Sequence, residues 1–337
     1  MLLSVCIPTY NRAQNLDNCL NSIKIASQTI DPSIVEICIS DNASKDKTSK
    51  VVEKFNKFLN LKYKKNKINL GIPKNFLNVV DMAKGKFIWL IGDDDLLLPN
   101  SLKDAIELLN NNQNLDFFYV NAFHLDNNYL INFKKPFDTI NLPKNLKKFS
   151  NFNFDGEVRF LDLISPEVSF DFLGGMFLSI FRKENWDLYT NVLNEKAINS
   201  NLLFSHLDNT FPHSKIFSIA FSQTKAYYNS IPLIVCLSGV REWSDKYPLV
   251  RSIRLVELLI EYRKNGLPFF QYVRCRNFAL QHFIPDLVRL LIKYENSGVK
   301  NVNILFWLLS NVFYPNFYFS PFIELIKKIK YYAKVKK

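Results

Sequence analysis

The first 123 residues alternate between short apolar segments and longer segments with helical periodicity. In one of the longer segments, Leu16, Leu20 and Ile23 recur on one side of a helix. Strand-like apolar runs occupy residues 2–7, 34–39, 61–65, 87–91 and 116–123. Repeated strand-helix units with buried strands predict an α/β fold, in which a mostly parallel, Rossmann-like sheet is covered by helices on both faces.

The remainder of the chain changes character twice. Residues 124–156 are polar and predict a loop-rich insertion, and strand character returns at residues 173–181 and 226–237. From about residue 247 the patterns are helical. We therefore expect a first domain of residues 1–240 and a helical C-terminal region of residues 241–337, a division that suits a chain of 337 residues.

The composition is that of a folded, basic protein. Hydrophobic residues make up 48% of the chain and charged residues 22%, which excludes a wholly disordered chain. The 43 Lys and Arg residues exceed the 31 Asp and Glu residues and give a net charge of +12. No recognised nucleic-acid-binding motif accompanies this charge, so we expect no nucleic-acid partner.

The cysteines and the apolar runs bear on the compartment. The chain has five cysteines and no CxxC motif, so a disulfide framework is not expected and a reducing, cytoplasmic compartment is. The N-terminal apolar run lacks a charged segment before it and is broken by Pro8, unlike a signal peptide. The longest apolar run, near residues 304–312, is shorter than the ~18–20 residues of a membrane-spanning helix.

Three consecutive aspartates directly follow the apolar run 87–91, in the segment Gly92-Asp93-Asp94-Asp95. Neighbouring carboxylates repel one another and lose hydration on burial unless water or a cation reaches them. At the carboxyl end of a buried strand they lie where open α/β sheets bind ligands. On an extended segment Asp93 and Asp95 would point the same way and could share one hard cation with phosphate oxygens. The alternative is an acidic turn that caps the helix beginning at Pro99, although a cap requires a single acid.

Polar residues also follow the earlier strands. The first strand continues into Ile7-Pro8-Thr9-Tyr10-Asn11-Arg12, which suits a loop around a nucleotide, with Arg12 either near phosphate or exposed. Asp41 ends the second strand, where its carboxylate can accept hydrogen bonds from a ribose or a base. A tight turn at Gly71 precedes Asn75, whose side chain faces either the site or solvent.

In this order the segments resemble the GT-A glycosyltransferases of family 2. The family pattern has a strand ending in IPTYNR, a strand ending in an aspartate, as in ISDNASKD, an NxG turn, and a strand ending in DDD. The resemblance covers roughly residues 1–240. Within the family the chain looks most like the O-antigen sugar transferases related to abequosyltransferase, through the segments Phe211-Pro212-His213 and Ala226-Tyr227-Tyr228-Asn229.

The resemblance implies a sugar donor activated by UDP, GDP, CDP or dTDP, and a divalent ion, Mn²⁺ or Mg²⁺. Asp95 would bind the ion, Asp93 would contact the ion and the ribose, and Asp41 would bind the base or the ribose. An arginine-and-tryptophan loop of the family would correspond to Arg241 and Trp243. The other residues that would line the donor are Pro8, Thr9, Tyr10, Arg12, Asn75 and Asp94.

The resemblance also implies an acceptor site and a catalytic base. Gly174 and Gly175 match a Gly-Gly strand that lies beside the acceptor. The family usually carries a Glu-Asp pair, but here Leu207 replaces the glutamate and Asp208 is retained. His213 is the competing base, with a structural histidine as the alternative. In-line attack by an acceptor hydroxyl would invert the anomeric centre with one base and one metal ion.

The C-terminal segment is strongly basic. Residues 327–337 contain six lysines beside Tyr331 and Tyr332. A solvated end is one explanation. The other is a surface patch that meets an anionic inner leaflet, where each lysine contributes about 1 kcal/mol and nearby aromatic residues lie at the interface. Such contact would suit a lipid-linked acceptor.

The sequence therefore predicts an inverting, metal-dependent glycosyltransferase of surface polysaccharide or O-antigen synthesis. Its acceptor would be a saccharide or a lipid-linked saccharide, reached from the cytoplasmic side of the membrane. Two alternatives stay open: a nucleotide-sugar-binding protein with degraded catalysis, and a metal-dependent phosphoryl-transfer enzyme built on the three aspartates. A dinucleotide dehydrogenase is not expected, because no G-x-G-x-x-G follows the first strand.

Overall fold

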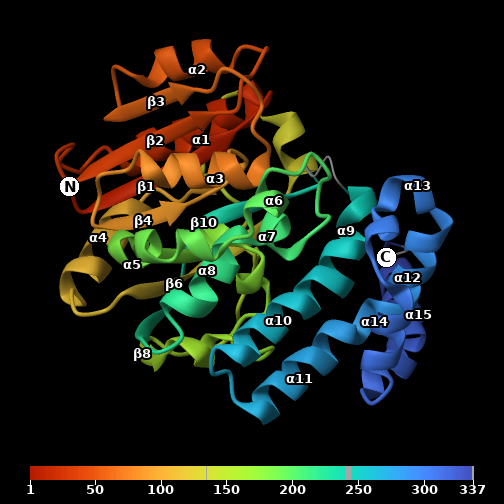
Figure 1. The fold of residues 1–337 in the computed structure, drawn as a ribbon. Helices are drawn as coiled ribbons and strands as arrows, with labels where there is room; N and C mark the ends of the chain where they lie inside the picture. Colours follow the sequence, from red (N-terminus) through yellow and green to blue (C-terminus); the bar gives the residue numbers. More distant parts are fainter. Residues whose placement is uncertain (134, 240–243, 336–337) are drawn as a thin grey trace. The chain divides into compact units, whose positions relative to one another are not determined.

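The computed structural model describes residues 1–133, 135–239 and 244–335, with side chains up to residue 330. Its internal contacts divide the chain into two compact units. The first unit comprises Met1–Val192 and Gln223–Arg241, and the second comprises Leu193–Ser222 and Glu242–Lys337. Figure 1 shows the strands concentrated in the first unit and helices in the second.

The first unit is built on one mixed sheet, and four of its strands are parallel neighbours. The register pairs Thr9 with Asp41, and Cys6 with both Cys38 and Leu90. Every residue of the strands Leu3–Thr9 and Val35–Asp41 is buried, which explains their largely apolar sequences. In sheet order the four strands are β3 (Leu61–Lys65), β2 (Val35–Asp41), β1 (Leu3–Thr9) and β4 (Phe87–Leu90).

The other half of the sheet is mixed. Beyond β4 it continues, in order, with β9 (Ser179–Arg182), β6 (Phe117–Asp126), β10 (Lys225–Ser238) and β5 (Asp95–Leu97). Strand β6 is parallel to β10, whereas β9 and β5 are antiparallel to their neighbours. Short strands β7 (Lys147–Lys148) and β8 (Gly156–Arg159) pair with β6 and β10. The parallel half was predicted, but the short strand β5 was not, because three residues carry no periodic signal.

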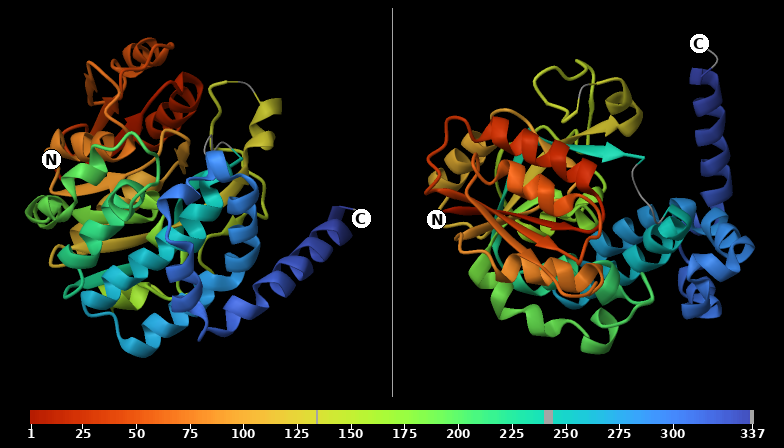
Figure 2. Two further views of the ribbon diagram at one scale, coloured as in Figure 1. Left: turned by 45° about the vertical axis from the view of Figure 1, so that its right-hand side comes forward. Right: turned by 90° about the horizontal axis from the view of Figure 1, so that it is seen from above.

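Helices cover both faces of the parallel strands. Right-handed crossovers place α1 (Ala13–Ala26) and α2 (Thr48–Phe55) on one face. The crossover from β3 back to β4 runs in the opposite direction, so α3 (Ile72–Asp81) covers the other face, as Figure 2 shows. Helix α4 (Ser101–Asn111) packs against β10 and α1. The expected α/β class is therefore confirmed.

The predicted strand at residues 173–181 is shorter than expected. Gly174 and Gly175 lie between two 3₁₀ turns, Asp171–Leu173 and Met176–Leu178, and the strand β9 begins at Ser179. The Gly174 and Gly175 N–H groups both donate to the carbonyl of Asp171, at 3.0 and 2.8 Å. These bonds close a turn, which is why the Gly-Gly segment does not join the sheet.

The second unit differs from the expected C-terminal region because residues 193–222 belong to it. Within this unit α8 (Pro212–Ala220) packs against α10 (Leu255–Lys264). The buried Arg254 guanidinium donates to the carbonyls of Phe204 and Ser205, at 2.9 and 2.7 Å. These long-range contacts carry no local sequence signal, so the pattern-based boundary at residue 240 did not include them.

The remaining helices of the second unit are mostly short. They include α6 (Glu195–Ile198), α7 (Leu207–Thr210), α9 (Tyr247–Leu249), α11 (Phe269–Ala279), α12 (Phe283–Ile292), α13 (Tyr294–Ser297), α14 (Ile304–Asn311) and α15 (Pro315–Val335). None of the helices among the described residues combines the length and the apolar character needed to cross a bilayer.

Candidate active site

The polar residues predicted from the strand ends meet at one edge of the sheet. Strands β1, β2 and β4 are parallel, so their carboxyl ends lie side by side at this edge. Thr9 and Asp41 are register partners at the ends of β1 and β2. The Ile91 N–H donates to the carbonyl of Cys6 at 3.0 Å, which carries β4 alongside β1 up to the aspartates.

A charged cluster joins the end of β1 to the segment after β4. The Arg12 guanidinium donates to Asp93 at 2.6 Å and to Asp94 at 2.8 Å, and so bridges two of the three carboxylates. The Thr9 hydroxyl donates to the other oxygen of Asp93 at 2.7 Å. Asp93 is 3% exposed, so the Arg12 guanidinium offsets much of the free-energy cost of burying the negative charge of Asp93. From the sequence we expected Arg12 to lie either near phosphate or exposed to solvent. Neither expectation included its ion pairs with Asp93 and Asp94.

The segment that carries the three aspartates is not extended. Asp93 and Asp94 form a turn, closed by a 3.2 Å bond from the Asp95 N–H to the Gly92 carbonyl. The Asp95 carboxylate turns back and accepts the Gly92 N–H at 2.7 Å. The expectation of an extended segment is therefore wrong, because the chain reverses before β5 begins. That Asp93 and Asp95 share one cation stays a prediction.

The electrostatics of Asp95 follow from its position. Burial, with further repulsion from Asp94 and Asp93, raises the pKa of the Asp95 carboxyl well above its ordinary value. The Gly92 N–H acts against this shift by stabilising the ionised form. A nearby cation would shift the balance further toward the carboxylate.

A divalent cation fits the donor chemistry of this segment but would need further ligands. Among the described residues no group of three or more His, Cys, Asp and Glu side chains is placed to hold a metal ion. Yet Arg12 pairs with two of the three neighbouring carboxylates, and hard cations prefer oxygen ligands. Mg²⁺ sites of substrate phosphates commonly use one or two carboxylates, with phosphate and water oxygens completing the shell.

Asp41 is held by two hydrogen bonds. Its carboxylate accepts the Ser44 N–H at 2.8 Å and the Tyr63 hydroxyl at 2.6 Å. The hydroxyl of Tyr63, on β3, also lies 2.8 Å from that of Ser49. Burial and the hydrogen bond to Asp41 raise the pKa of Tyr63 to about 12, so the phenol remains a donor at neutral pH. The sequence analysis did not single out Tyr63, which pairs in register with Ile39, two residues before Asp41.

Asn75 is buried and bound to the strands. Its amide donates to the Ser40 carbonyl at 2.9 Å and accepts from the Ser40 hydroxyl at 2.7 Å. It also accepts from Asn66 at 3.2 Å and donates to the Thr9 carbonyl at 3.4 Å. Between the two alternatives raised from the sequence, the side chain faces the end of the strands and is 3% exposed.

The remaining predicted donor residues divide between exposed and undescribed positions. Pro8 is buried within β1, and Tyr10 is 41% exposed just beyond the end of that strand. An exposed ring beside the polar edge is available for stacking on a base. Arg241 and Trp243 lie outside the described residues.

Comparison with known proteins identifies the family of the chain. The model of the family "Glycosyl transferase family 2" matches residues 4–177, more than half of the chain. The chain belongs to this family. Abequosyltransferase RfbV of Salmonella typhimurium is 31% identical over 294 residues, which cover 86% of this chain and 80% of that enzyme. A Campylobacter jejuni protein, GalNAc(5)-diNAcBac-PP-undecaprenol beta-1,3-glucosyltransferase, is 31% identical over 54% of this chain and 52% of its own length.

Solved structures support the same fold. TarS 1–349 of S. aureus in complex with UDP aligns with a TM-score of 0.52 at 18% identity, covering 84% of this chain and 71% of that chain. The mannosyltransferase PcManGT of Pyrobaculum calidifontis, in complex with GDP-Man and Mn²⁺, aligns with a TM-score of 0.53 at 13% identity over 96% of this chain and 84% of its own. The predicted family and its GT-A fold are both confirmed.

The two base candidates of this family 2 glycosyltransferase lie in the second compact unit. Asp208 is fully buried. Its carboxylate accepts from Lys215 Nζ at 2.9 and 2.8 Å and from the Asn194 N–H at 2.5 Å. The sequence analysis did not predict this ion pair. Burial lowers the pKa of His213 to about 3, so its imidazole is neutral at physiological pH.

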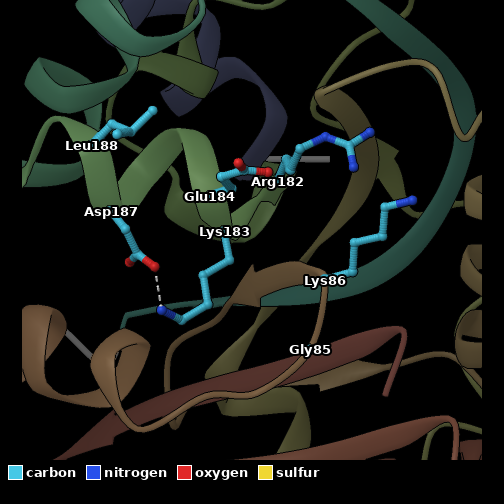
Figure 3. Close-up of a pocket in the computed structure, with 7 residues that line it drawn as sticks. All are labelled: Gly85, Lys86, Arg182, Lys183, Glu184, Asp187 and Leu188. Atoms are coloured by element: carbon cyan, nitrogen blue, oxygen red, sulfur yellow. Dashed lines mark hydrogen bonds and ion pairs between the residues drawn. The ribbon is translucent and has the colours of Figure 1, made fainter.

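A separate hollow of about 510 Å³ lies at the opposite end of β4. Gly85 and Lys86 precede this strand, whereas the aspartates follow it (Figure 3). Two of the basic side chains here are engaged, because Lys183 pairs with Asp187 at 2.5 Å and Arg182 pairs with Asp116. This hollow is therefore distinct from the polar edge that carries the family motifs.

Proposed function

We propose that this glycosyltransferase transfers a sugar, with inversion, from a nucleoside-diphosphate donor to a saccharide or lipid-linked saccharide in surface polysaccharide or O-antigen synthesis. The observation that carries the proposal is the meeting of Thr9, Arg12, Asp41 and the three aspartates at the carboxyl edge of three parallel strands. The likeness to RfbV over most of both chains supports an O-antigen sugar as the group transferred.

The donor would lie along this edge. Asp41, held by Ser44 and Tyr63, would accept hydrogen bonds from the base or ribose. The exposed ring of Tyr10 would stack on the base, and Pro8 and Thr9 would shape the floor beneath it. Asp93 and Asp94, bridged by Arg12, would lie nearest the ribose and diphosphate. Asn75 would act indirectly, because its hydrogen bonds fix the ends of β1 and β2.

A divalent ion would complete the diphosphate site. Asp95, with Asp93, would hold Mn²⁺ or Mg²⁺ together with phosphate oxygens. When bound, such an ion neutralises the negative charge that builds on the leaving phosphates. Binding of the ion would keep Asp95 ionised against the repulsion of its neighbours.

Asp208 is the proposed base. A base must lie within ~3 Å of the acceptor hydroxyl and have a pKa suited to taking its proton. Burial lowers the pKa of His213 to about 3, so its imidazole is no more basic than an ordinary carboxylate. Asp208 would have to exchange one contact with Lys215 for the acceptor hydroxyl. Gly174, exposed in its turn, and the half-buried Gly175 beside it would line the acceptor sugar.

The first test is nucleotide binding. Thermal unfolding is followed with UDP, GDP, CDP or dTDP, each with Mn²⁺ or with EDTA. One nucleotide should raise Tm with Mn²⁺, since a ligand that binds the folded state stabilises it by mass action. Asp95→Asn should remove most of this shift, whereas Asp81→Asn, at the exposed end of α3, should not. Equal affinity with Mn²⁺ and with EDTA would contradict the metal role.

The same preparation separates the two alternatives. A binding protein with degraded catalysis would show the Tm shift but neither sugar transfer nor hydrolysis of the nucleotide sugar. A phosphoryl-transfer enzyme would release phosphate from simple nucleotides. Sugar transfer with an inverted anomeric configuration, observed by NMR of the product, is the expected result.

A further inference from the structure

The last helix of the chain exposes its apolar side. The side chains of Tyr318, Phe322, Leu325 and Ile329 on α15 are between 55% and 64% exposed. Their spacing of four, three and four residues places them on one face of an α-helix. We call these four residues the outer stripe of α15. Surface helices of globular proteins normally turn such a face toward the core.

The opposite face of α15 is polar and holds the helix to its own unit. The Asn316 amide donates to the Asn277 carbonyl at 2.9 Å, and Ser320 accepts the Ile284 N–H at 3.2 Å. Glu324 pairs with both His282 and Arg289. Hydrogen bonds and ion pairs therefore fix which face of α15 points outward, and the outer stripe remains exposed. Figure 2 shows the final turns of α15 extending past the other helices of this unit.

The segment before the outer stripe also exposes apolar side chains. Residues 301–323 contain no Asp, Glu, Lys, Arg or His. In α14 and just after it, Leu305, Leu309 and Phe313 are 66%, 62% and 90% exposed, with the spacing of one helical face. The junction with α15 is anchored, because Arg276 donates to the Ser310 carbonyl at 2.9 Å and its guanidinium lies 4.9 Å from the ring of Tyr314.

The charge around the outer stripe identifies the partner. Residues 244–337 contain sixteen Lys and Arg residues but six Asp and Glu residues. On α15 the single acid, Glu324, is already paired, while Lys328 and Lys330 are exposed beside the stripe. An apolar stripe flanked by cations suits the boundary between anionic headgroups and acyl chains. A two-fold contact between copies would instead bring the lysines of both chains together.

We propose that the outer stripe of α15, with its flanking lysines, is a docking surface for an anionic lipid bilayer. The helix would lie in the interface, with the stripe among the acyl chains and Lys328 and Lys330 at the headgroups. The docking surface is a property of the helix itself and does not depend on the reaction. Its benefit, which is to bring the enzyme to a lipid-linked acceptor, rests on the proposed function.

The test is cosedimentation of the whole chain with vesicles, which requires no turnover. Vesicles of phosphatidylcholine mixed with phosphatidylglycerol should bind the protein at low salt, and vesicles of phosphatidylcholine alone should bind it much less. The triple variant Phe322→Ser, Leu325→Ser, Ile329→Ser should bind the anionic vesicles at least about tenfold more weakly. Lys328→Gln with Lys330→Gln should reduce the difference between the two lipid compositions.

A matched control uses three exposed aliphatic residues of the first unit. Ile131, Ile140 and Leu188 are 67%, 61% and 66% exposed, and their replacement by serine should leave vesicle binding unchanged. Circular dichroism and Tm establish that each variant is folded, and the nucleotide-dependent Tm shift should persist in all of them. If the unaltered chain shows no nucleotide-dependent Tm shift, the result counts against the proposed function but not against the docking surface.

Three results would overturn the docking surface. The first is equal binding of the unaltered chain to neutral and anionic vesicles, or binding to neither. The second is vesicle binding by the serine triple variant that matches the unaltered chain. The third is an oligomer of the unaltered chain that the triple variant converts to a monomer without a change in lipid binding, which would make a second copy the partner.

Discussion

At the scale of single residues, hydrogen bonds between side chains orient the carboxylates at the edge of the sheet where the donor is proposed to bind. Tyr63 donates to Asp41, and Arg12 bridges Asp93 and Asp94. Hydrogen bonds to ionised groups are stronger than those between neutral groups, so these contacts orient the carboxylates before a ligand arrives. Their loss should therefore affect ligand binding more than the chemical step.

The first residue-scale prediction concerns Tyr63. Tyr63→Phe removes a hydrogen bond to a charged group, worth about 1.5–3 kcal/mol, and frees Asp41 to rotate. The donor KM should rise by roughly tenfold or more while kcat stays nearly unchanged, as steady-state kinetics would show. Ser49→Ala removes the other partner of the Tyr63 hydroxyl and should change KM little. An unchanged KM in Tyr63→Phe would show that Asp41 does not depend on this bond.

A second residue-scale prediction concerns the base. Asp208→Asn should lower kcat by about 10²–10⁴-fold, with donor affinity nearly unchanged, because proton transfer is lost and donor binding is not. Lys215→Met removes the partner of Asp208 but keeps the carboxylate, and should retain far more activity.

The ion pair also has a purely structural explanation, and Tm separates the two. If Asp208 serves only the fold, Asp208→Asn and Lys215→Met should lower Tm alike and kcat alike. If Asp208→Asn remains active and His213→Phe does not, the base is His213.

At the scale of elements, the functional edge depends on how α3 is tied to β1 and β2. Asn75 supplies this tie from the first turns of α3, through Ser40 on β2 and the Thr9 carbonyl on β1. Asn66, between β3 and α3, adds a further bond to Asn75. A single buried amide thus aligns the ends of neighbouring strands on which the donor residues stand.

The element-scale prediction is that Asn75→Leu destabilises the protein. The change leaves several buried polar groups without their partner, at about 1–3 kcal/mol each, so we expect a loss of roughly 2–4 kcal/mol in urea unfolding. Asn78→Leu, a half-buried position on the same helix, is the matched control and should cost far less. Weaker donor binding with unchanged stability would mean instead that Asn75 contacts the donor directly.

At the scale of the whole molecule, buried ionisable groups couple folding to pH. The folded chain keeps His213 neutral, with a pKa of about 3, because burial penalises the charged ring. The unfolded chain takes up a proton there below pH ~6.5. Since the unfolded state then binds more protons, stability is complete above pH ~6.5 and falls as the pH is lowered, by about 1.4 kcal/mol for each pH unit down to about 3.

The whole-molecule prediction concerns this loss of stability as the pH is lowered. Between pH ~7.5 and ~5 the unaltered chain should lose about 2 kcal/mol more stability than His213→Phe, measured by urea unfolding at each pH. Phenylalanine suits a site between Phe211 and Phe217 and does not titrate. His282, whose pKa is also lowered by burial, should keep part of the pH dependence in the variant. Parallel pH profiles of the two proteins would show that His213 is protonated equally in both states.

Local patterns determined much of this protein. Apolar runs and helical periodicity predicted the β-α order of the first half, and parallel strands then required Asp41 and Asp93 to lie at one edge. These features follow from residues close together in sequence, so the sequence by itself is sufficient for them. The same holds for the family motifs in residues 4–177, on which the expected activity depended.

The tertiary structure alone decided the partners across long separations. Arg12 meets Asp93 across 81 residues, the Arg254 guanidinium meets the Phe204 carbonyl across 50 residues, and residues 193–222 join the C-terminal helices. It also decided that α15 turns its polar side inward, through Glu324 and its partners. Each outcome depends on which surfaces the folded backbone brings within a few ångströms, and periodicity along one segment contains no information about a distant partner.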